Sequence, residues 1–463
     1  MKNNNFILRS DGYKYTHFKQ YPPQTTEVYS YFESRGGKYD KTVFFGLQYY
    51  IKEYLVGVRL THEDIDNTKK LISTYLSTPD NFNEAGWRYI VDKHDGKLPI
   101  EIKAVPEGSI VPTSNVLFTV RNTDSECFWL TNFIETLLSK VWYTTTIATN
   151  SYYIKETIKK YLRETGCNDI DTIANFKLHD FGYRGVATEE QAALGGAAHL
   201  LSFMGTDTVL ALQFIMDYYN TDEVMGFSIP ASEHSTITSW GKDRELDAYR
   251  NMLEQYPSGL VACVSDSYNI YNACENLWGE ELKSEILNRD GQLICRPDSG
   301  VPTKVLPRML SILGDKFGYT INDKGYKVLN DKVRVIQGDG IDADSIIDIL
   351  DCLCNEHGWA AENITFGSGG GLLQKFDRDT QKFAVKCSYT KNVFGEIDVY
   401  KDPVTDPGKT SKKGKLKLVK VGHHDYVTNS VDFGGKDELR TVFLNGKLIT
   451  EYTFEEIKHN MEV

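Results

Sequence analysis

Polar side chains recur at the ends of apolar runs in the second half of the chain, and their types suit phosphate, sugar and ring chemistry. The segment GSGGG at 367–371 carries four glycines. Such a turn lets backbone N–H groups point at an anion at the start of a helix. No G-K-[ST] follows it, and no G-x-G-x-x-G opens an N-terminal dinucleotide-binding unit. We therefore predict a phosphate site here rather than a plain flexible turn.

Three aspartates, Asp266, Asp298 and Asp339, each follow a predicted strand. Three carboxylates around one cavity can bind ribose hydroxyls, hold Mg²⁺ through oxygen ligands, or stabilise a developing positive charge. Aspartate also caps helices frequently, and capping is the simpler interpretation of any one of them alone. Next to a phosphate turn, the three together favour a site. Arg184 and Arg296 add cations suited to bidentate contacts with phosphate.

His234 follows Glu233 in the loop after another apolar run. Its side chain type allows a general base, a metal ligand, a phosphate acceptor or a purely structural role, and the residues alone leave these open. Six lysines between positions 409 and 420 indicate either a solvated hairpin face or a cationic patch that gathers pyrophosphate.

The elements that position these residues follow one repeating order, a short apolar run, a polar loop and a helical stretch. We find seven such segments, at 178–185, 202–208, 227–236, 261–267, 293–300, 333–340 and 364–371. Strands alternating with helices predict a parallel sheet, and seven units in roughly 200 residues predict a closed or nearly closed, TIM-like β/α barrel. The loops after the strands of such a barrel share one face, which would bring Asp207 and the residues above together.

The barrel is expected over residues 146–384. Residues 1–145 show mixed strand and helix signals, including an amphipathic stretch at 127–142, and residues 385–463 contain strand and turn signals. We predict that 1–145 and 385–463 form one flanking mixed α/β domain built from both chain ends.

Composition limits the class of protein. Of the 463 residues, 41 % are hydrophobic and 25 % are charged, which excludes a disordered chain. The 52 basic and 64 acidic residues leave a net charge of −12, which argues against general nucleic-acid binding. Neither a membrane helix nor a signal peptide is evident, and the eight scattered cysteines are typical of reduced thiols, so we expect a cytoplasmic protein.

Taken together, these residues resemble the nicotinamide phosphoribosyltransferase family, and the likeness runs nearly from end to end. The matching segments are DGYKYTHFKQYPP (11–23), HDFGYRG (179–185), MGTDT (204–208), ASEHSTITSWGKD (231–243), VSDSYNIYNACE (264–275), RPDSG (296–300), VIQGDG (335–340), FGSGGGLLQK (366–375) and KDPVTDP (401–407). The resemblance implies a type II phosphoribosyltransferase barrel, a homodimer with shared active sites, and transfer of phosphoribosyl from phosphoribosyl pyrophosphate to nicotinamide. It further implies Mg²⁺ as cofactor and ATP as co-substrate.

The resemblance also implies roles for single residues. For nicotinamide these are Phe181, Asp207 and Arg296, with Tyr13 of the partner subunit. For ribose and its 5′-phosphate they are Asp298, Gly338, Asp339, Gly369 and Gly370, with Arg378 of the partner subunit. For pyrophosphate they are Arg184, with Arg35, Lys386 and Lys401 of the partner subunit. Asp266 would lie near Mg²⁺, and His234 would be phosphorylated by ATP.

Two alternatives remain at this point. One is a nicotinate phosphoribosyltransferase, although a nicotinate carboxylate ~4 Å from Asp207 would be repelled by about 4 kcal/mol at an effective dielectric constant of 20. The other is a non-catalytic nucleotide-binding protein of the same fold.

Overall fold

The computed structural model describes residues 5–405 and 410–462. Lys409 and the last two residues of the 401–407 segment therefore lie outside the described residues. The chain forms two compact units: unit 1 comprises Met1–Thr149, Met216–Thr221 and Phe376–Val463, and unit 2 comprises Asn150–Ile215 and Asp222–Lys375. The predicted domain boundaries at 145/146 and 384/385 stay predictions, and the short excursion at Met216–Thr221 had no signal in the sequence.

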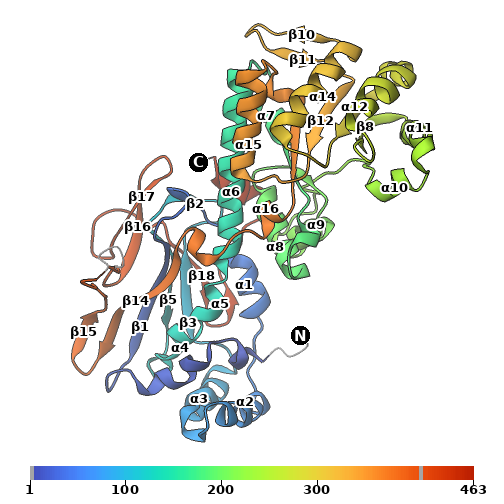
Figure 1. Ribbon diagram of the computed structural model, residues 1–463. Coiled ribbons are helices and arrows are strands. Elements are labelled where there is room, and N and C mark those ends of the chain that lie inside the picture. Colours follow the sequence, from blue (N-terminus) through green and yellow to red (C-terminus); the bar gives the residue numbers. More distant parts are fainter. Residues whose placement is uncertain (1–4, 406–409, 463) are drawn as a thin grey trace. The chain divides into compact units, whose positions relative to one another are not determined.

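Unit 1 is built on an antiparallel sheet to which both ends of the chain contribute (Figure 1). Within the described residues this sheet has seven strands, in the order β15-β14-β1-β5-β3-β18-β19. Their bounds are β1 (Glu27–Ser34), β3 (Ile100–Ala104), β5 (Val116–Asn122), β14 (Phe383–Asn392), β15 (Gly395–Asp398), β18 (Arg440–Leu444) and β19 (Lys447–Leu448). Strand β1 pairs with β14 along its whole length, so the two chain ends are held together by backbone hydrogen bonds.

Smaller elements complete unit 1. Two short two-stranded sheets pair β2 (Lys41–Val43) with β4 (Ile110–Pro112), and β16 (Leu416–Gly422) with β17 (Asp425–Ser430). The α-helices are α1 (Leu47–Tyr54), α2 (His62–Tyr75), α3 (Glu84–His94), α4 (Leu130–Phe133), α5 (Glu135–Leu138) and α17 (Phe454–Asn460), and the 3₁₀ helices include η2 (Gly12–Lys19), η4 (Ser125–Cys127) and η10 (Arg378–Thr380). Helices α6 (Val141–Glu164) and α9 (Val209–Tyr219) have residues in each unit.

A buried carboxylate caps helix α1 of unit 1. The Glu107 side chain accepts hydrogen bonds from the N–H groups of Gly46 (3.1 Å) and Gln48 (2.6 Å) and from the Tyr219 hydroxyl (3.1 Å). Burial raises the pKa of Glu107 to about 7, and these hydrogen bonds oppose the rise. The first turn of α1 is therefore satisfied by a residue from a distant segment.

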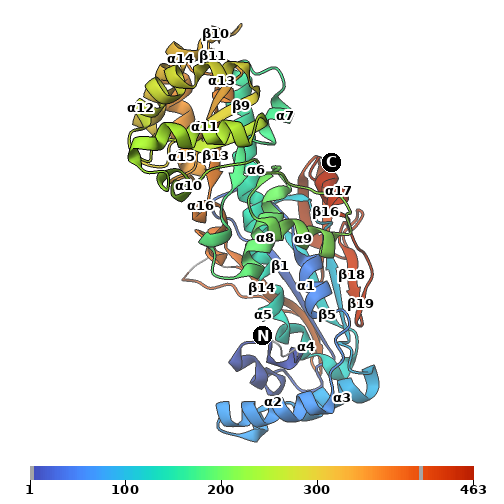
Figure 2. The ribbon, with the colours of Figure 1, turned by 90° about the vertical axis from the view of Figure 1, so that its right-hand side faces the viewer.

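Unit 2 contains a parallel sheet, as the alternating pattern predicts. Among the described residues it has six strands in the order β7-β6-β13-β12-β9-β8, and every strand pair is parallel. The strands are β6 (Leu178–Asp180), β7 (Gly205–Thr206), β8 (Ser258–Val264), β9 (Asp290–Arg296), β12 (Val333–Gln337) and β13 (Ile364–Ser368). In Figure 2, β9 and β13 lie within a surround of helices that includes α11 and α12.

The remaining elements of unit 2 connect these strands. The helices are α7 (Ile170–Ala174), η5 (Tyr183–Gly185), α8 (Glu189–Leu200), α10 (His234–Thr238), η6 (Lys242–Arg244), α11 (Glu245–Gln255), α12 (Ile270–Asn272), η7 (Ala273–Glu281), α13 (Lys283–Asn288), α14 (Pro302–Phe317), α15 (Ala343–Leu350), η8 (Asp351–Glu356), η9 (Ala361–Asn363) and α16 (Gly370–Leu373). A hairpin of β10 (Tyr319–Ile321) and β11 (Lys327–Leu329) follows α14.

One predicted strand, in the 227–236 segment, is replaced by two isolated parallel bridges. Phe227 bridges Gly205 of β7, and Ala231 bridges Ala262 of β8. The segment from Phe227 to Ala231 thus contacts both edge strands of the sheet without forming a strand itself. The parallel β/α arrangement is confirmed, whereas a complete TIM barrel, which needs eight strands, is not seen in the described residues.

The interior of the parallel sheet is apolar and close to the predicted site. Ala262, Ile294 and Ile336, from three neighbouring strands, form a buried cluster against which Phe181 and Ile229 pack. All eight cysteines lie in the described residues as free thiols. Every described helix is too short or too polar to cross a lipid bilayer.

Candidate active site

A cavity of about 540 Å³ opens in unit 2 where the loops after β6 and β7 meet the end of β9. Parallel β/α folds place their ligand sites at this carboxyl edge of the strands. The cavity is lined by Phe181, Tyr183, Arg184, Val186, Ala187, Thr188, Glu189, Asp207 and Arg296. Four of the predicted site residues therefore share one cavity.

Phe181 is held against the strand next to its own. Its N–H donates to the carbonyl of Ser368 at 2.9 Å, and its ring packs on the apolar core of the sheet. A Cβ atom placed on Gly367 would lie 2.8 Å from Cζ of this ring and closer still to Cδ2 and Cε2. Gly367, the first glycine of GSGGG, thus makes room for the aromatic ring, a role that the sequence did not indicate.

Asp207 and Arg296 present complementary groups to the cavity. The Ser228 hydroxyl donates to Oδ1 of Asp207, so one carboxylate oxygen is oriented by a neighbour. In the described part of the chain, Nε of Arg296 is buried and has no hydrogen-bond partner. Since the Arg296 residue lines the cavity, its planar guanidinium is suited to donate to a carbonyl oxygen or a phosphate of a ligand.

His234 lies between two carboxylates at the start of α10. Its Nε2 is 3.0 Å from Oδ1 of Asp266, and its Nδ1 is 3.7 Å from Oδ2 of Asp298. The Asp266 side chain is only 4 % exposed, whereas that of His234 is 45 % exposed. A buried carboxylate that orients a solvent-accessible imidazole is an arrangement suited to a phosphate acceptor.

Asp266 does not fit a direct Mg²⁺ ligand in this arrangement. Its Oδ2 accepts from the N–H of Asp298 at 3.0 Å and from the Ser299 hydroxyl, while Oδ1 faces His234. Both oxygens are therefore engaged in a nearly inaccessible side chain, and Mg²⁺ requires open oxygen ligands. Asp266 instead joins the loops after β8 and β9 and orients His234.

The ribose residues lie close to the aromatic ring. A Cβ atom on Gly338 would lie 3.6 Å from Cε2 of Phe181 and 3.7 Å from Oδ1 of Asp298. Asp339, the next residue, is exposed. The loops after β6, β8, β9, β12 and β13 thus approach one another, as the predicted shared rim requires.

The glycine turn leaves backbone donors available. Within the described residues, the N–H groups of Gly369 and Gly370 donate to no protein acceptor. A Cβ atom on Gly185 would lie 3.2 Å from the nitrogen of Gly370, so the turn next to Arg184 runs beside this one. Two N–H groups with an arginine nearby suit a phosphate group.

The other predicted residues lie in unit 1, where four cations gather. Burial lowers the pKa of Lys386, and the charges of Arg35, Lys401 and Arg378 act in the same direction, while Glu135 opposes them. Such mutual influence requires these side chains to be near one another. Nε of Arg35 is buried without a hydrogen-bond partner in the described part of the chain. A group of four cations in one unit has the charge to attract an anion.

Tyr13 and the lysine-rich segment complete the predicted set. Tyr13 lies on η2 with 60 % of its surface exposed. Several lysines of the segment are already paired: Lys412 with Glu33, and Lys415 with Glu27 at 2.9 Å. Lys417 and Lys420 lie on the hairpin of β16 and β17, whereas Lys412, Lys413 and Lys415 precede it, and Lys417 is buried.

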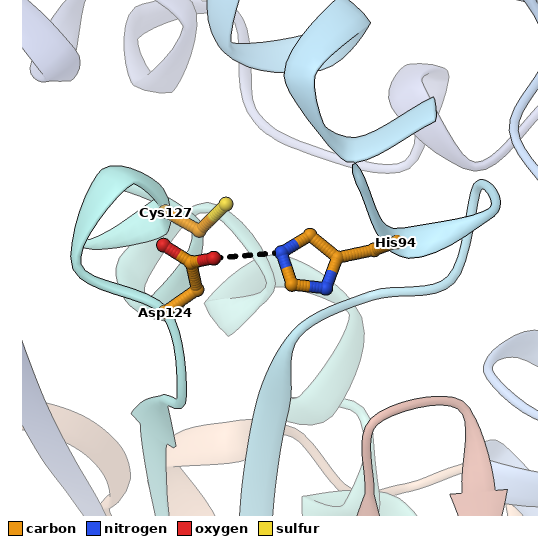
Figure 3. A group of neighbouring side chains, drawn as sticks. All are labelled: His94, Asp124 and Cys127. Atoms are coloured by element: carbon orange, nitrogen blue, oxygen red, sulfur yellow. Dashed lines mark hydrogen bonds and ion pairs between the residues drawn. The ribbon is translucent and has the colours of Figure 1, made fainter. Parts of the chain in front are cut away.

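A separate group of His94, Asp124 and Cys127 in unit 1 has residue types that bind metals (Figure 3). Nε2 of His94 bonds directly to Oδ2 of Asp124 at 2.8 Å, and the Tyr89 hydroxyl donates to the same oxygen. Burial and the charges of Asp124 and Glu126 raise the pKa of the Cys127 thiol to about 12. The hydrogen bonds of His94 and Tyr89 to Asp124 thus connect α3 with the start of η4, which gives the group a structural role without a metal.

Sequence reasoning missed several residues of the site. Ser228 and Tyr183 lie inside the segments singled out for other residues, and the run from Val186 to Glu189 lines the cavity at the start of α8. The Thr188 hydroxyl accepts from the N–H of Gln191 and so caps α8. Proximity to a recognised motif was the one signal that could have pointed to Ser228.

Known proteins are similar to this chain in sequence and in fold. Residues 176–447 match the nicotinate phosphoribosyltransferase (NAPRTase) family, and residues 5–102 match the nicotinamide phosphoribosyltransferase N-terminal domain. A nicotinamide phosphoribosyltransferase of Xanthomonas campestris is 50 % identical, covering 98 % of this chain and 97 % of the relative. Another of that name, from Acinetobacter baylyi, is 36 % identical, covering 97 % and 96 %.

Solved structures agree on the fold. A nicotinate-nucleotide pyrophosphorylase of Pyrococcus furiosus superposes with a TM-score of 0.62 at 14 % identity, covering 100 % of this chain and 96 % of that one. Human nicotinic acid phosphoribosyltransferase superposes with a TM-score of 0.55 at 14 % identity, covering 98 % and 93 %.

Proposed function

The chain belongs to the nicotinamide phosphoribosyltransferase family, and we propose that it transfers phosphoribosyl from phosphoribosyl pyrophosphate to nicotinamide in the cytoplasm. The products are nicotinamide mononucleotide and pyrophosphate, and the pathway is NAD salvage. The cavity that combines the Phe181 ring, the Asp207 carboxylate and the Arg296 guanidinium is the observation that carries this proposal. An aromatic amide matches all three groups.

In the proposed complex the pyridine ring stacks on Phe181, and its carboxamide N–H donates to Asp207. Arg296 lines the same cavity, and its guanidinium donates to the carboxamide oxygen. The ring nitrogen attacks the anomeric carbon of the ribose with its own lone pair, and the carbon–oxygen bond to pyrophosphate breaks. Pyrophosphate keeps that electron pair. No general base is required, because the attacking nitrogen carries no proton.

Charge stabilisation is the main task of the remaining residues. Positive charge develops on the ribose as pyrophosphate departs, and the carboxylates of Asp298 and Asp339 stabilise it. The free N–H groups of Gly369 and Gly370 hold the 5′-phosphate. Mg²⁺ would neutralise charge on pyrophosphate, with ligands other than Asp266, whose two carboxylate oxygens are already engaged.

We further propose a homodimer in which the four cations of unit 1 complete the cavity of the other subunit. Arg35, Lys386 and Lys401 would then face pyrophosphate together with Arg184, and Arg378 would face the 5′-phosphate. Tyr13 would stack on the free side of the nicotinamide ring. The exposure of Tyr13 and the grouping of the four cations support this assignment.

ATP is proposed as a second substrate at His234. A ring nitrogen of His234 forms a bond to the γ-phosphorus of ATP, and ADP departs with the electron pair of the broken bond. Hydrolysis of the phosphohistidine later releases phosphate. Asp266 holds the imidazole in place and stabilises its positive charge. The coupling draws the reaction toward the mononucleotide.

One assay tests the proposal. Purified protein is supplied with nicotinamide and phosphoribosyl pyrophosphate, with and without ATP, and mononucleotide and pyrophosphate are measured. We expect both products without ATP and more of both with ATP. Product formed with nicotinate in place of nicotinamide, and none with nicotinamide, would favour a nicotinate phosphoribosyltransferase. Absence of pyrophosphate with all substrates present would favour a non-catalytic binding protein.

A further inference from the structure

Asp180 is a buried carboxylate that the proposed mechanism does not use. It ends strand β6, directly before Phe181, and its side chain has no exposed surface. It does not line the cavity. A buried charge is costly unless nearby donors satisfy it, so its presence next to the aromatic residue calls for a physical reason.

The hydrogen bonds of Asp180 join two loops of the cavity. Its Oδ1 accepts from the N–H of Gly182 at 2.7 Å, which fixes the turn on the far side of Phe181. Its Oδ2 accepts from the Thr206 hydroxyl at 3.4 Å, and its main-chain carbonyl accepts from the N–H of Asp207 at 2.9 Å. Asp180 therefore connects the loop that carries Phe181 with the loop that carries Asp207.

Gly367 limits the position of the same ring from the neighbouring strand. Any side chain at Gly367 would overlap Cδ2, Cε2 and Cζ of Phe181. Phe181 also packs against the buried cluster of Ala262, Ile294 and Ile336, which opposes movement of the ring toward them. The turn at Gly182 thus positions the ring from one side, and Gly367 leaves the space that the ring occupies on the other.

We propose that Asp180 and Gly367 are positioning residues that set the Phe181 ring and its spacing from Asp207 for binding of the aromatic base. This inference rests on the proposed function, since it assigns the ring to the base. Neither residue touches substrate. Both act through Phe181, and the Asp180 side chain also acts through the Thr206 hydroxyl, next to Asp207.

The electrostatics of Asp180 are consistent with this geometry. Burial raises the pKa of Asp180 to about 6, the negative charge of Asp207 adds to the rise, and the Gly182 and Thr206 hydrogen bonds oppose it. Asparagine at this position would keep an oxygen that accepts from Gly182 and would lose the charge. Alanine would remove both.

The test compares Asp180→Ala, Asp180→Asn and Gly367→Ala with wild type. Steady-state kinetics gives KM for nicotinamide, KM for phosphoribosyl pyrophosphate and kcat, and calorimetry gives Kd for nicotinamide. In Asp180→Ala and Gly367→Ala we expect KM and Kd for nicotinamide to rise about tenfold or more, with KM for phosphoribosyl pyrophosphate within about twofold of wild type. Asp180→Asn should restore most of the affinity.

Asn363→Ala is the matched control. Asn363 is also buried in unit 2 and hydrogen-bonded, to Lys327, Leu329 and Ala360, but it lies at the amino end of β13, away from the cavity. We expect a lower unfolding temperature with unchanged KM values. Asn363→Ala therefore shows how much a loss of stability alone changes the KM values.

Several outcomes would overturn the inference. The first is wild-type affinity for nicotinamide in both Asp180→Ala and Gly367→Ala. The second is an equal rise of KM for nicotinamide and KM for phosphoribosyl pyrophosphate in these variants. The third is a rise of KM for nicotinamide in Asn363→Ala as large as in Asp180→Ala. If wild type makes no mononucleotide from nicotinamide, the proposed function fails, and calorimetry with nicotinamide and nicotinate still measures whether the variants weaken aromatic binding. Where Asp180→Ala does not fold, Asp180→Asn and Gly367→Ala decide the result.

Discussion

Replacement of Asp207 by asparagine should reduce the preference for nicotinamide over nicotinate. The Ser228 hydroxyl engages Oδ1 of Asp207, which leaves Oδ2 to accept from a carboxamide. A nicotinate carboxylate at the same place would face the aspartate charge at about 4 Å. Their repulsion is about 1 kcal/mol at the dielectric constant of water and about 4 kcal/mol at an effective value of 20.

Asp207 is exposed in a single chain, so solvent screening sets the lower end of that range. If the partner subunit covers the cavity, the upper end applies. The two limits correspond to a preference of about fivefold and about a thousandfold in kcat/KM. Asp207→Asn should lose this preference for nicotinamide, mainly because kcat/KM for nicotinate rises.

The assay is kcat/KM for both bases, measured at low and high salt. Ser228→Ala is the companion variant, since it keeps the charge and removes only the orienting hydrogen bond. We expect it to weaken nicotinamide use while nicotinate stays disfavoured. Equal kcat/KM values for the two bases in wild type, or an unchanged ratio in Asp207→Asn, would refute the reasoning.

Two further predictions concern His234 and Glu107. His234→Gln should abolish phosphate transfer from γ-labelled ATP and the stimulation by ATP while basal mononucleotide formation persists, and residual labelling of the variant would contradict this. Because the folded chain holds the Glu107 proton more tightly than the unfolded chain, ionisation of Glu107 destabilises the fold as pH rises from 4.5 to about 7, by about 3 kcal/mol. The free energy of unfolding of wild type minus that of Glu107→Gln should therefore fall by this amount across that window, and urea titrations showing a constant difference would contradict it.

The strand-end loops were predictable because each strand of a parallel sheet ends at the same edge, so polar residues after apolar runs must meet there. Phe181, Arg184, Asp207 and Arg296, which end or follow such strands, line one cavity. The sequence could not show that Gly367 serves Phe181 rather than phosphate, because that contact joins residues from distant segments. Nor could it show that both oxygens of Asp266 are already engaged.

Local pattern was also insufficient for the 127–142 stretch. Its periodicity predicts an amphipathic element, but the structure breaks it into α4, α5 and the start of α6. The Thr131 hydroxyl donates to the carbonyl of Val28, and the Ser30 hydroxyl donates to the Asn132 side chain. Contacts with β1 therefore override the helical period, since tertiary packing outweighs local propensity.

Phe227 and Ala231 each form a single-residue bridge to the parallel sheet, whereas β8 and β9 pair along seven residues. Local opening is cheapest where few backbone hydrogen bonds must break, so the amides of the segment from Phe227 to Ala231 should exchange with solvent deuterium ahead of those in β8 and β9. The same segment carries Ser228 and leads into His234. A phosphoryl group on His234 would thus act on a segment that opens more easily than β8 and β9. Because Ser228 in this segment orients Asp207, phosphorylation would link ATP use to binding of the nicotinamide base.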